Sequence, residues 1–494
     1  MFADWLWEKL AADYERRILA IDPDDVITRS GLEPKLKRHG FQIVDVEALG
    51  PIQFRYHYEV NYGKEEKKVI FLVRSDDAFV PYDVRKQCYE VNLSFETLFP
   101  KLDVNVLRRA KSLDLSLLYA ASRNDFGGRR GEEDTWLFLK QEMYSPENAD
   151  EYARWLIGTI EERLTTCRHY TDWFHIAEEW AKLRLLFDGG FTRQRIDTLL
   201  EKIENHFCKW LMVHYQRLSA SFHSQSPVML HKTNDYMRTK ANKLALIVVD
   251  GMSLANWLVF SQADFVPGFS YEQSYAFALI PTITSVSRLA LFSGKLPVEM
   301  AKPFALANEE KEWRAYWRKY GYSNHEIIYS RDSAYDPLPS VKVVGIIVNM
   351  IDNMMHGQVQ GQAGMFRDIT AWSQSGELQA LILRLLKKGF SVFLTSDHGN
   401  TESVGFGRPP NEGVLTELAG ERCRIYQEYA EIDRMISDQT HLFPPIYLPK
   451  QYKYVLAKER LCFHPRGKIV VCHGGMSIEE VIVPFIRIKG ADSM

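Results

Sequence analysis

The residues best able to carry chemistry are aspartates and histidines that follow four short apolar runs in the second half of the chain. LALIVV leads into Asp250, VVGIIVNMI into Asp352, SVFLTS into Asp397, and KIVVC into His473. His356 comes four residues after Asp352, and His398 follows Asp397 directly. Carboxylate oxygens and imidazole nitrogens are the ligands that zinc and similar divalent ions accept.

Strands of a sheet must position these residues. Continuous apolar runs are typical of central strands in a parallel sheet covered on both faces, and ligands bind beyond the carboxyl ends of such strands. A single aspartate after a strand is more often a turn or cap residue, but four such ends together favour a metal centre. Three aspartates and three histidines would furnish two sites of three ligands each. Two metal ions can clamp the attacking and leaving oxygens of a phosphoryl displacement.

A hydroxyl nucleophile is available in the segment ALIPTITSVSRLALFSGKLP. Thr282, Thr284 and Ser285 stand just ahead of a predicted helix that Gly294 would end. A hydroxyl at a helix N-terminus lies at the positive end of the helix dipole, and a bound metal ion would help it to lose its proton. The alternative is an ordinary threonine cap. The neighbouring clusters of metal ligands favour the nucleophile.

Composition limits the other functions. The 494 residues carry a net charge of -3, so no long-range basic field indicates nucleic acid or anionic lipid as a partner, although a local basic groove is still allowed. The six cysteines are scattered and form no CxxC pair, which fits a reducing compartment. We find no signal-peptide core and no apolar run long enough for a membrane helix. We therefore expect a cytoplasmic protein without membrane contacts.

The chain is predicted to have three parts. Residues 1–111 are expected to form a small α/β domain, with a helix in LEPKLKRHG and strands in ILAID, FQIVDV, FRYHYEV and KKVIFLVR. Residues 112–238 are predicted to be a helical linker or interaction domain. In its last helix, with Thr192 as N-cap, apolar residues recur at helical spacing: Ile196, Leu199, Leu200, Ile203 and Phe207.

Residues 239–494 are predicted to be the catalytic domain. The stretch LHKTNDYMRTKANK, at residues 230–243, is expected to be a solvated linker that leads into it. Residues 402–468 are long for a loop and rich in aromatic residues and arginine, including Phe406, Arg408 and Tyr426. We expect them to form a cap that faces the substrate. A packed subdomain explains the same residues.

The order of these motifs resembles the alkaline phosphatase superfamily: an aspartate, then PTIT before a helix, DNMMH, DHG and a final HGG. Within it, the chain is similar to the PglZ family of bacterial BREX phage-defence systems, and ILAIDPD, RYHYEV, VPYDV and LFPKL extend the likeness into the first half. The resemblance implies an α/β fold whose parallel sheet core has helices on both faces. It also implies two divalent metal ions, with Zn²⁺ expected and Mn²⁺ or Mg²⁺ as alternatives, and other BREX defence proteins as partners.

The resemblance also assigns the site. Asp250, Asp397 and His398 would hold one metal ion with Thr284 bridging as nucleophile, and the second ion would be held by Asp352, His356 and His473. Related nucleotide pyrophosphatase/phosphodiesterases place the nucleophile as the second threonine of P-T-x-T, ten residues before a glycine and thirteen before a proline. Gly294 and Pro297 stand at those offsets from Thr284. Arg288, one helical turn further on, is a candidate to face the phosphate.

We therefore expect a metal-dependent phosphoester hydrolase that cleaves a nucleotide or DNA phosphodiester through a phosphothreonine. Two alternatives stay open: a phosphomonoesterase, and a metal-stabilised scaffold whose helical part docks partners of the defence system. The stretch DHGNTE also resembles the cofactor-independent phosphoglycerate mutases. Those enzymes use a serine nucleophile, and both the PTITS segment and the N-terminal half depart from their pattern.

Overall fold

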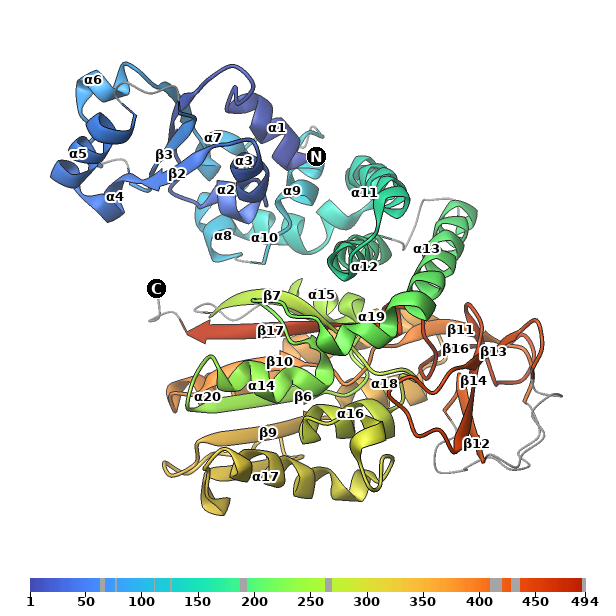
Figure 1. The fold of residues 1–494 in the computed structure, drawn as a ribbon. Helices are drawn as coiled ribbons and strands as arrows, with labels where there is room; N and C mark the ends of the chain where they lie inside the picture. Colours follow the sequence, from blue (N-terminus) through green and yellow to red (C-terminus); the bar gives the residue numbers. More distant parts are fainter. Residues whose placement is uncertain are drawn as a thin grey trace. The chain divides into compact units, whose positions relative to one another are not determined.

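The computed structural model describes residues 1–62, 67–75, 78–110, 112–124, 127–186, 193–262, 269–408, 420–427 and 436–490. The chain forms two compact units, Met1–Leu156 and Ile157–Met494, which are drawn in Figure 1. The predicted boundaries near residues 111 and 238 fall inside these units, and the division into three parts stays a prediction.

The first unit contains a four-stranded parallel sheet in the order β2-β3-β1-β4. Its strands are β1 (Arg17–Ile21), β2 (Gln42–Asp45), β3 (Val69–Val73) and β4 (Tyr89–Asn92). Its helices include α1 (Phe2–Lys9), α2 (Val26–Arg29), α3 (Glu33–Arg38), α4 (Val46–Leu49), α5 (Pro51–Asn61), α6 (Tyr82–Arg85), α7 (Phe95–Leu98), α8 (Val104–Arg109), α9 (Leu115–Ser122) and α10 (Glu132–Lys140). The strands predicted in ILAID, FQIVDV and KKVIFLVR are confirmed.

The prediction that FRYHYEV is a strand was wrong, because this segment lies in helix α5. Phe54 and Tyr58 are buried, whereas Tyr56 between them is 71% exposed. Alternating large residues look like a half-buried strand, but positions four apart also share one face of a helix. Pro51 in the first turn, directly after Gly50, favours the helix, since proline is preorganised for that position.

Three long helices follow: α11 (Pro146–Thr166), α12 (Tyr170–Leu185) and α13 (Arg193–His214). All five apolar residues that were predicted to form one face of α13 are buried. The helical character of this region is therefore confirmed. The predicted N-cap, Thr192, lies outside the described residues.

The second unit is built on a seven-stranded sheet in the order β5-β7-β17-β10-β6-β9-β8. The strands are β5 (Val228–Met229), β6 (Leu244–Val249), β7 (Phe269–Phe277), β8 (Ile327–Ser330), β9 (Val343–Val348), β10 (Ser391–Thr395) and β17 (Ile482–Gly490). The four strands β10, β6, β9 and β8 are parallel, as predicted. The sheet as a whole is mixed, because β17 runs antiparallel to both β10 and β7.

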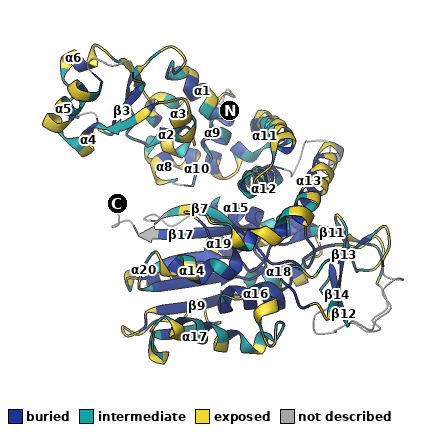
Figure 2. Ribbon diagram, viewed as in Figure 1, coloured by how far each residue is buried: buried dark blue, intermediate teal, exposed yellow. Residues whose placement is uncertain are grey.

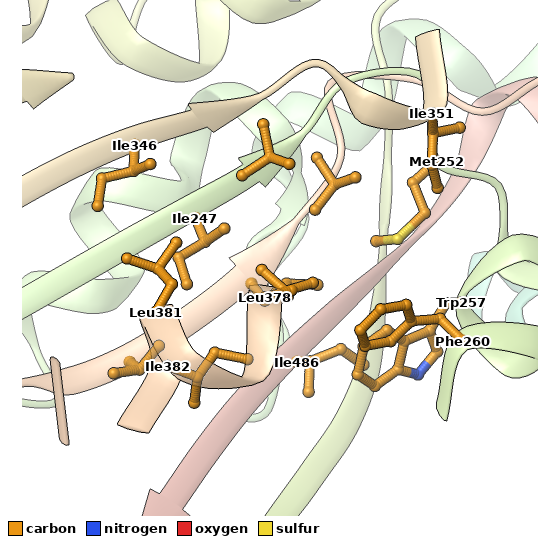
Figure 3. Close-up of a cluster of buried hydrophobic side chains, with 14 of the residues drawn as sticks. Ile247, Met252, Trp257, Phe260, Ile346, Ile351, Leu378, Leu381, Ile382 and Ile486 are labelled. Atoms are coloured by element: carbon orange, nitrogen blue, oxygen red, sulfur yellow. The ribbon is translucent and has the colours of Figure 1, made fainter. Parts of the chain in front are cut away.

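Helices cover both faces of this sheet, as predicted. They are α14 (Thr233–Arg238), α15 (Leu254–Gln262), α16 (Thr284–Ser293), α17 (Glu309–Lys319), α18 (Met350–Gly357), α19 (Gly361–Ser375), α20 (Glu377–Lys387) and α21 (Ile478–Val481). In Figure 3 one face of the sheet packs on α15 and α20 through Ile247, Ile346, Ile486, Trp257, Phe260, Leu378, Leu381 and Ile382. Figure 2 shows that the central strands are buried.

The opposite face is covered by α14, α16 and α17. Tyr236 of α14 makes edge contacts with the rings of Phe393 and Phe485. A Cβ atom on Gly345 of β9 would lie 2.9 Å from the ring of Phe292 and 3.0 Å from that of Trp313. Gly345 therefore lets α16 and α17 approach the sheet closely enough to hold the start of α16 beside the strand ends.

The segment at residues 230–243 is not the solvated linker that we predicted. Thr233 and Asn234 are fully buried, and Asn234 Nδ2 donates to the backbone carbonyls of Leu291 and Phe292 at 3.1 and 3.0 Å. The side-chain NH2 group of Asn234 can be buried here because the backbone at the end of α16 offers it acceptors. The segment is therefore part of the second unit rather than a connection to it.

The run KIVVC also lies elsewhere than predicted. It forms β16 (Ile469–Cys472), which belongs to a separate three-stranded sheet with β11 (Thr401–Gly405) and β15 (Leu461–Cys462) rather than to the main sheet. Strand β11 follows the DHGN turn at the end of β10, and Thr401 pairs antiparallel with Cys472. His473 thus reaches the end of β10 through this pairing, without being in the main sheet.

The described part of the predicted cap forms a three-stranded antiparallel sheet of β12 (Cys423–Gln427), β14 (Tyr452–Ala457) and β13 (Thr440–Phe443). Tyr426 is 1% exposed, and the rings of Phe406 and Phe463 lie 5.3 Å apart in one small core. These aromatic residues therefore pack inside the region, whereas Arg408 is exposed. None of the helices in the described part of the chain has the length and apolar character of a membrane-spanning segment.

Candidate metal centre

Asp250, Asp397 and His398 meet at the carboxyl ends of β6 and β10. The two strands are parallel, and Thr395 pairs with Val248, so Asp250 and Asp397 leave the sheet side by side. One ligand atom from each of the three residues lies within 4.8 Å of the others. His398 Nε2 is 3.8 Å from Asp250 Oδ1 and 3.7 Å from Asp397 Oδ2. All three side chains are buried.

One oxygen of each carboxylate is already bonded. Asp397 Oδ1 accepts the backbone N–H groups of Gly251 and His398, both at 3.1 Å, and Asp250 Oδ2 accepts from Arg288. Among the described residues, the other two oxygens, Asp250 Oδ1 and Asp397 Oδ2, are buried without a hydrogen-bond partner. Buried carboxylate oxygens without a partner are unfavourable unless a cation or a proton satisfies them. The donor set therefore fits a divalent cation.

The two buried histidines have a fixed orientation. His398 Nδ1 lies 3.0 Å from the carbonyl of Gly399, and His473 Nδ1 lies 2.9 Å from the carbonyl of Thr282. A carbonyl can only accept, so each neutral ring carries its proton on Nδ1 and presents the lone pair of Nε2. Burial lowers the pKa of both imidazoles and keeps them neutral, the form that binds metal.

The two aspartates repel each other in this setting. Burial, followed by the charge of Asp250, raises the pKa of Asp397 far above its usual range, and Arg288 only partly opposes this. Two buried carboxylates this close cannot both ionise easily without a compensating charge. A proton or a further cation would relieve this repulsion, and a divalent cation bound to both carboxylates would displace the proton.

Thr284 is the first residue of α16, and its Oγ1 lies 3.1 Å from His398 Nε2. Its hydroxyl therefore stands beside the nitrogen that faces the two free carboxylate oxygens. Thr282 has a different role: its Oγ1 donates to the carbonyl of Gly475 at 2.9 Å and accepts from the N–H of Gly474 at 3.2 Å. Of the two threonines, Thr284 faces the cluster and Thr282 anchors the HGG loop.

The second predicted set is adjacent but less compact. His356 Nε2 is 3.4 Å from Asp352 Oδ1 on the same helix, and the His356 side chain is 55% exposed. The rings of His473 and His398 stack with centroids 4.1 Å apart. A Cβ atom on Gly251 would lie 3.8 Å from His398 Cε1 and 4.0 Å from the Cα of Asp352. Within the described residues, Asp352, His356 and His473 do not converge on one point as the first set does.

Arg288 lies behind the first set. It is 3% exposed, donates to Asp250, and places Nε 3.0 Å from Glu309 Oε1. Burial acts to lower the pKa of Arg288, but the charges of Asp250, Asp397 and Glu309 outweigh it and raise the pKa. Sequence reasoning missed Glu309, which is 1% exposed. Its one local signal is its place in the first turn of α17, where acidic residues are common.

No curated protein matches the chain significantly. Among solved structures, murine ectonucleotide pyrophosphatase/phosphodiesterase 5 is 12% identical, with 49% of this chain and 87% of that chain covered and a TM-score of 0.36. The human protein of that name is 12% identical, with 50% and 88% covered and a TM-score of 0.37. Phosphonoacetate hydrolase from Sinorhizobium meliloti 1021 is 10% identical, with 50% and 89% covered and a TM-score of 0.35.

A family model gives the decisive match. The BREX system PglZ alkaline phosphatase-like domain matches residues 228–488, which is more than half of the chain. The matched range begins at β5, and it contains every predicted ligand and Thr284. It also includes the buried segment at 230–243. The chain therefore belongs to the PglZ family, and its second unit carries the alkaline phosphatase-like phosphoesterase domain of that family.

Proposed function

We propose that the chain hydrolyses a phosphodiester of nucleotide or nucleic-acid type in the cytoplasm, as part of a BREX-type phage-defence system. Asp250, Asp397 and His398 would hold one divalent ion, and Asp352, His356 and His473 a second, with Zn²⁺ as the expected metal and Mn²⁺ or Mg²⁺ as alternatives. The bound ions would supply positive charge that makes the Thr284 hydroxyl easier to deprotonate and offsets charge on the phosphoryl oxygens. The unpaired buried oxygens of Asp250 and Asp397 are the observation that supports this function most strongly.

The proposed reaction has two steps. Thr284 Oγ loses its proton and attacks phosphorus, and the bond from phosphorus to the first alcohol breaks as that alcohol takes up a proton. This leaves a phosphothreonine that still carries the second alcohol as its ester. Water then attacks the same phosphorus and restores the Thr284 hydroxyl, so one phosphodiester and one water give one alcohol and one phosphomonoester.

The charges near Thr284 favour a diester over a monoester. A monoester is a dianion near neutral pH and needs additional cationic groups, whereas a diester carries one negative charge. Among the described residues, Arg288 is the one cationic side chain that is hydrogen-bonded or ion-paired to a predicted ligand, and Asp250 and Glu309 already neutralise it. The position of Arg288 supports a role in holding Asp250 rather than the predicted contact with the phosphate. The nucleotide type rests on the BREX context, because phage nucleic acid is a phosphodiester.

The test uses the full chain loaded with Zn²⁺, Mn²⁺ or Mg²⁺ in turn. We expect hydrolysis of bis-p-nitrophenyl phosphate, of cyclic dinucleotides or of single- or double-stranded DNA to exceed that of p-nitrophenyl phosphate. Thr284→Ala removes the nucleophile and should reduce the diesterase rate by roughly a thousandfold or more, while the bound metal is retained. Thr282→Ser is a matched control that keeps a hydroxyl on the HGG loop. An unchanged rate in Thr284→Ala would overturn the assignment.

A further inference from the structure

A second cavity lies in the second unit, apart from the metal centre. Its volume is about 680 Å³, and α12, α13, α19, β11 and β15 contribute to its walls. None of the predicted metal ligands lines it. Pockets that bind small molecules in proteins usually measure about 300–1,000 Å³. The size of the cavity therefore suits a ligand larger than a water cluster or a single ion.

Two arginines supply positive charge on the inner side of the cavity. The side chain of Arg184 is 14% exposed, and its Nε is 3.5 Å from Glu479 Oε1. Arg460 donates through Nε to the carbonyl of Glu402 at 2.6 Å. Both arginines line the cavity. Burial acts to raise the pKa of the neighbouring Glu479 carboxyl, but the charges of Arg460 and Arg184 outweigh it and lower this pKa. A guanidinium group carries several N–H donors in a planar fork and suits a carboxylate or phosphate oxygen.

Glu204 also lines the inner side of the cavity and is 7% exposed. Burial, followed by the charge of Glu479, raises the pKa of Glu204 to about 8. The Glu204 carboxyl is therefore mostly protonated at neutral pH. In that form it adds no negative charge beside the arginines and can donate a hydrogen bond to an anion.

The rest of the cavity has two further zones. Leu200, Phe366 and Leu461 give it an apolar wall. Acidic residues that are exposed to solvent also line it, namely Asp197, Glu201 and Glu459. A polyanion would be repelled by these exposed carboxylates. A neutral apolar ligand would offer no acceptor to the two guanidinium groups that line the cavity.

We propose that this cavity binds a small zwitterion, with its carboxylate toward Arg184 and Arg460, an apolar body along the wall, and an ammonium group toward the acidic rim. A dipeptide with a basic first residue and an apolar last residue has this pattern. The proposal does not depend on the hydrolase reaction, because no residue of the metal centre takes part in it. Binding to the cavity and catalysis at the metal centre can therefore be tested separately.

The first test is calorimetric titration of the full chain with the dipeptide lysyl-leucine at pH 7. We expect saturable binding, and binding at least about tenfold weaker for lysyl-leucine amide, which lacks the carboxylate and its charge-assisted hydrogen bonds. Glutamyl-leucine, whose first residue is acidic, should also bind more weakly. No binding of lysyl-leucine, or equal affinity for its amide, would overturn the proposal.

Variants locate the binding to this cavity. Arg460→Met should weaken lysyl-leucine about tenfold, since it removes a guanidinium but keeps an apolar stem. The control is Arg318→Met, which removes an exposed arginine on α17. If Arg460→Met does not fold, Glu201→Lys tests the rim, because Glu201 is exposed. That variant should weaken lysyl-leucine and strengthen glutamyl-leucine. Unchanged affinities in Glu201→Lys and in folded Arg460→Met would refute the proposal.

Discussion

The two units of the chain use the same local arrangement, an aspartate within two residues of the end of a buried parallel strand, with different outcomes. In the first unit Asp22 follows β1, and both of its oxygens are bonded: Oδ1 accepts from Val26 N at 2.6 Å and Oδ2 from Ile27 N at 3.1 Å. In the second unit Asp250 and Asp397 follow β6 and β10, and each keeps one buried oxygen without a partner among the described residues.

The neighbouring acid in the first unit strengthens this contrast. Asp24 accepts from the backbone N–H of Phe95 at 2.7 Å and from Arg108 Nε at 2.6 Å. Its hydrogen-bonding capacity is thus used by the protein itself, as expected for a structural acid. An aspartate at a strand end therefore does not identify a metal site. What distinguishes the metal centre is an oxygen that the fold leaves unsatisfied beside an imidazole nitrogen.

The largest expected effect separates these two kinds of aspartate. Asp397→Asn should reduce the phosphodiesterase rate by roughly a thousandfold, because it removes one of the two charges that bind the cation. Asp22→Asn, the same change at the strand end in the first unit, should leave the rate within about threefold of wild type, provided the protein stays folded. Steady-state rates at saturating metal measure both. Similar losses of rate in Asp397→Asn and Asp22→Asn would show that the two aspartates do not differ in their role in catalysis.

A smaller effect is expected for the residues behind Asp250. Glu309→Gln should weaken metal binding and lower the diesterase rate, each by roughly ten- to a hundredfold, because Glu309 orients Arg288, which in turn holds Asp250. Titration of metal into the metal-free protein measures the affinity. Glu310→Gln is the matched control, since Glu310 is the exposed neighbour on the same helix. Equal metal affinity in wild type, Glu309→Gln and Glu310→Gln would show that Glu309 does not support the metal centre.

In the first unit the aspartate should matter for stability. Asp22→Asn should cost about 1–3 kcal/mol of folding free energy, because an amide oxygen replaces a carboxylate that accepts two backbone N–H groups at the start of α2. Denaturant unfolding followed by circular dichroism measures this cost. Asp25→Asn, at a half-exposed position, serves for comparison. If Asp22→Asn has the same free energy of unfolding as wild type, the hydrogen bonds to the Asp22 carboxylate do not stabilise the first unit.

An effect of similar size, confined to high pH, is expected for Glu204 in the second unit. Its pKa is about 8 in the folded chain and 4.5 as its ordinary value, so the folded state binds more protons between these values. Stability contributed by the neutral carboxyl is therefore present at low pH and is lost as pH rises toward 8. Glu204→Gln should remove this loss and gain roughly 1–3 kcal/mol relative to wild type at pH 8.5. Melting temperatures of wild type and Glu204→Gln from pH 5 to 9 test this prediction. If the two proteins show the same dependence of melting temperature on pH, the prediction is contradicted.

The sequence predicted the ligand-bearing ends of β6, β9 and β10 because continuous apolar runs that end in an acid are a local pattern. It could not predict the place of β16, since the pairing of Thr401 with Cys472 joins residues far apart in the chain. The buried segment around Asn234 was missed for a similar reason. The sequence around Asn234 is polar and looks solvated, whereas in the structure the carbonyls of Leu291 and Phe292 accept hydrogen bonds from the Asn234 side chain.

The site residues also differ in how local their sequence signals are. In the sequence, only the spacing of the P-T-x-T motif in a similar family favours Thr284 over Thr282 as the nucleophile. In the structure their hydroxyl contacts distinguish them, because Thr284 contacts His398 and Thr282 contacts the carbonyl of Gly475. Glu309 lies outside every motif, and its contact with Arg288 depends on how α16 packs against α17. The alternating pattern of FRYHYEV was ambiguous, because positions four residues apart lie on one face in both strands and helices.

The most direct test of the metal centre is the metal content of purified protein, measured by mass spectrometry after dialysis, for wild type, Thr284→Ala, Asp397→Asn and Asp22→Asn. Wild type, Thr284→Ala and Asp22→Asn should each retain two equivalents of a divalent ion, with Zn²⁺ expected. Asp397→Asn should lose at least one equivalent, because Asp397 Oδ2 has no other partner among the described residues. Metal content in Asp397→Asn equal to that of wild type, or no bound metal in wild type, would contradict the account.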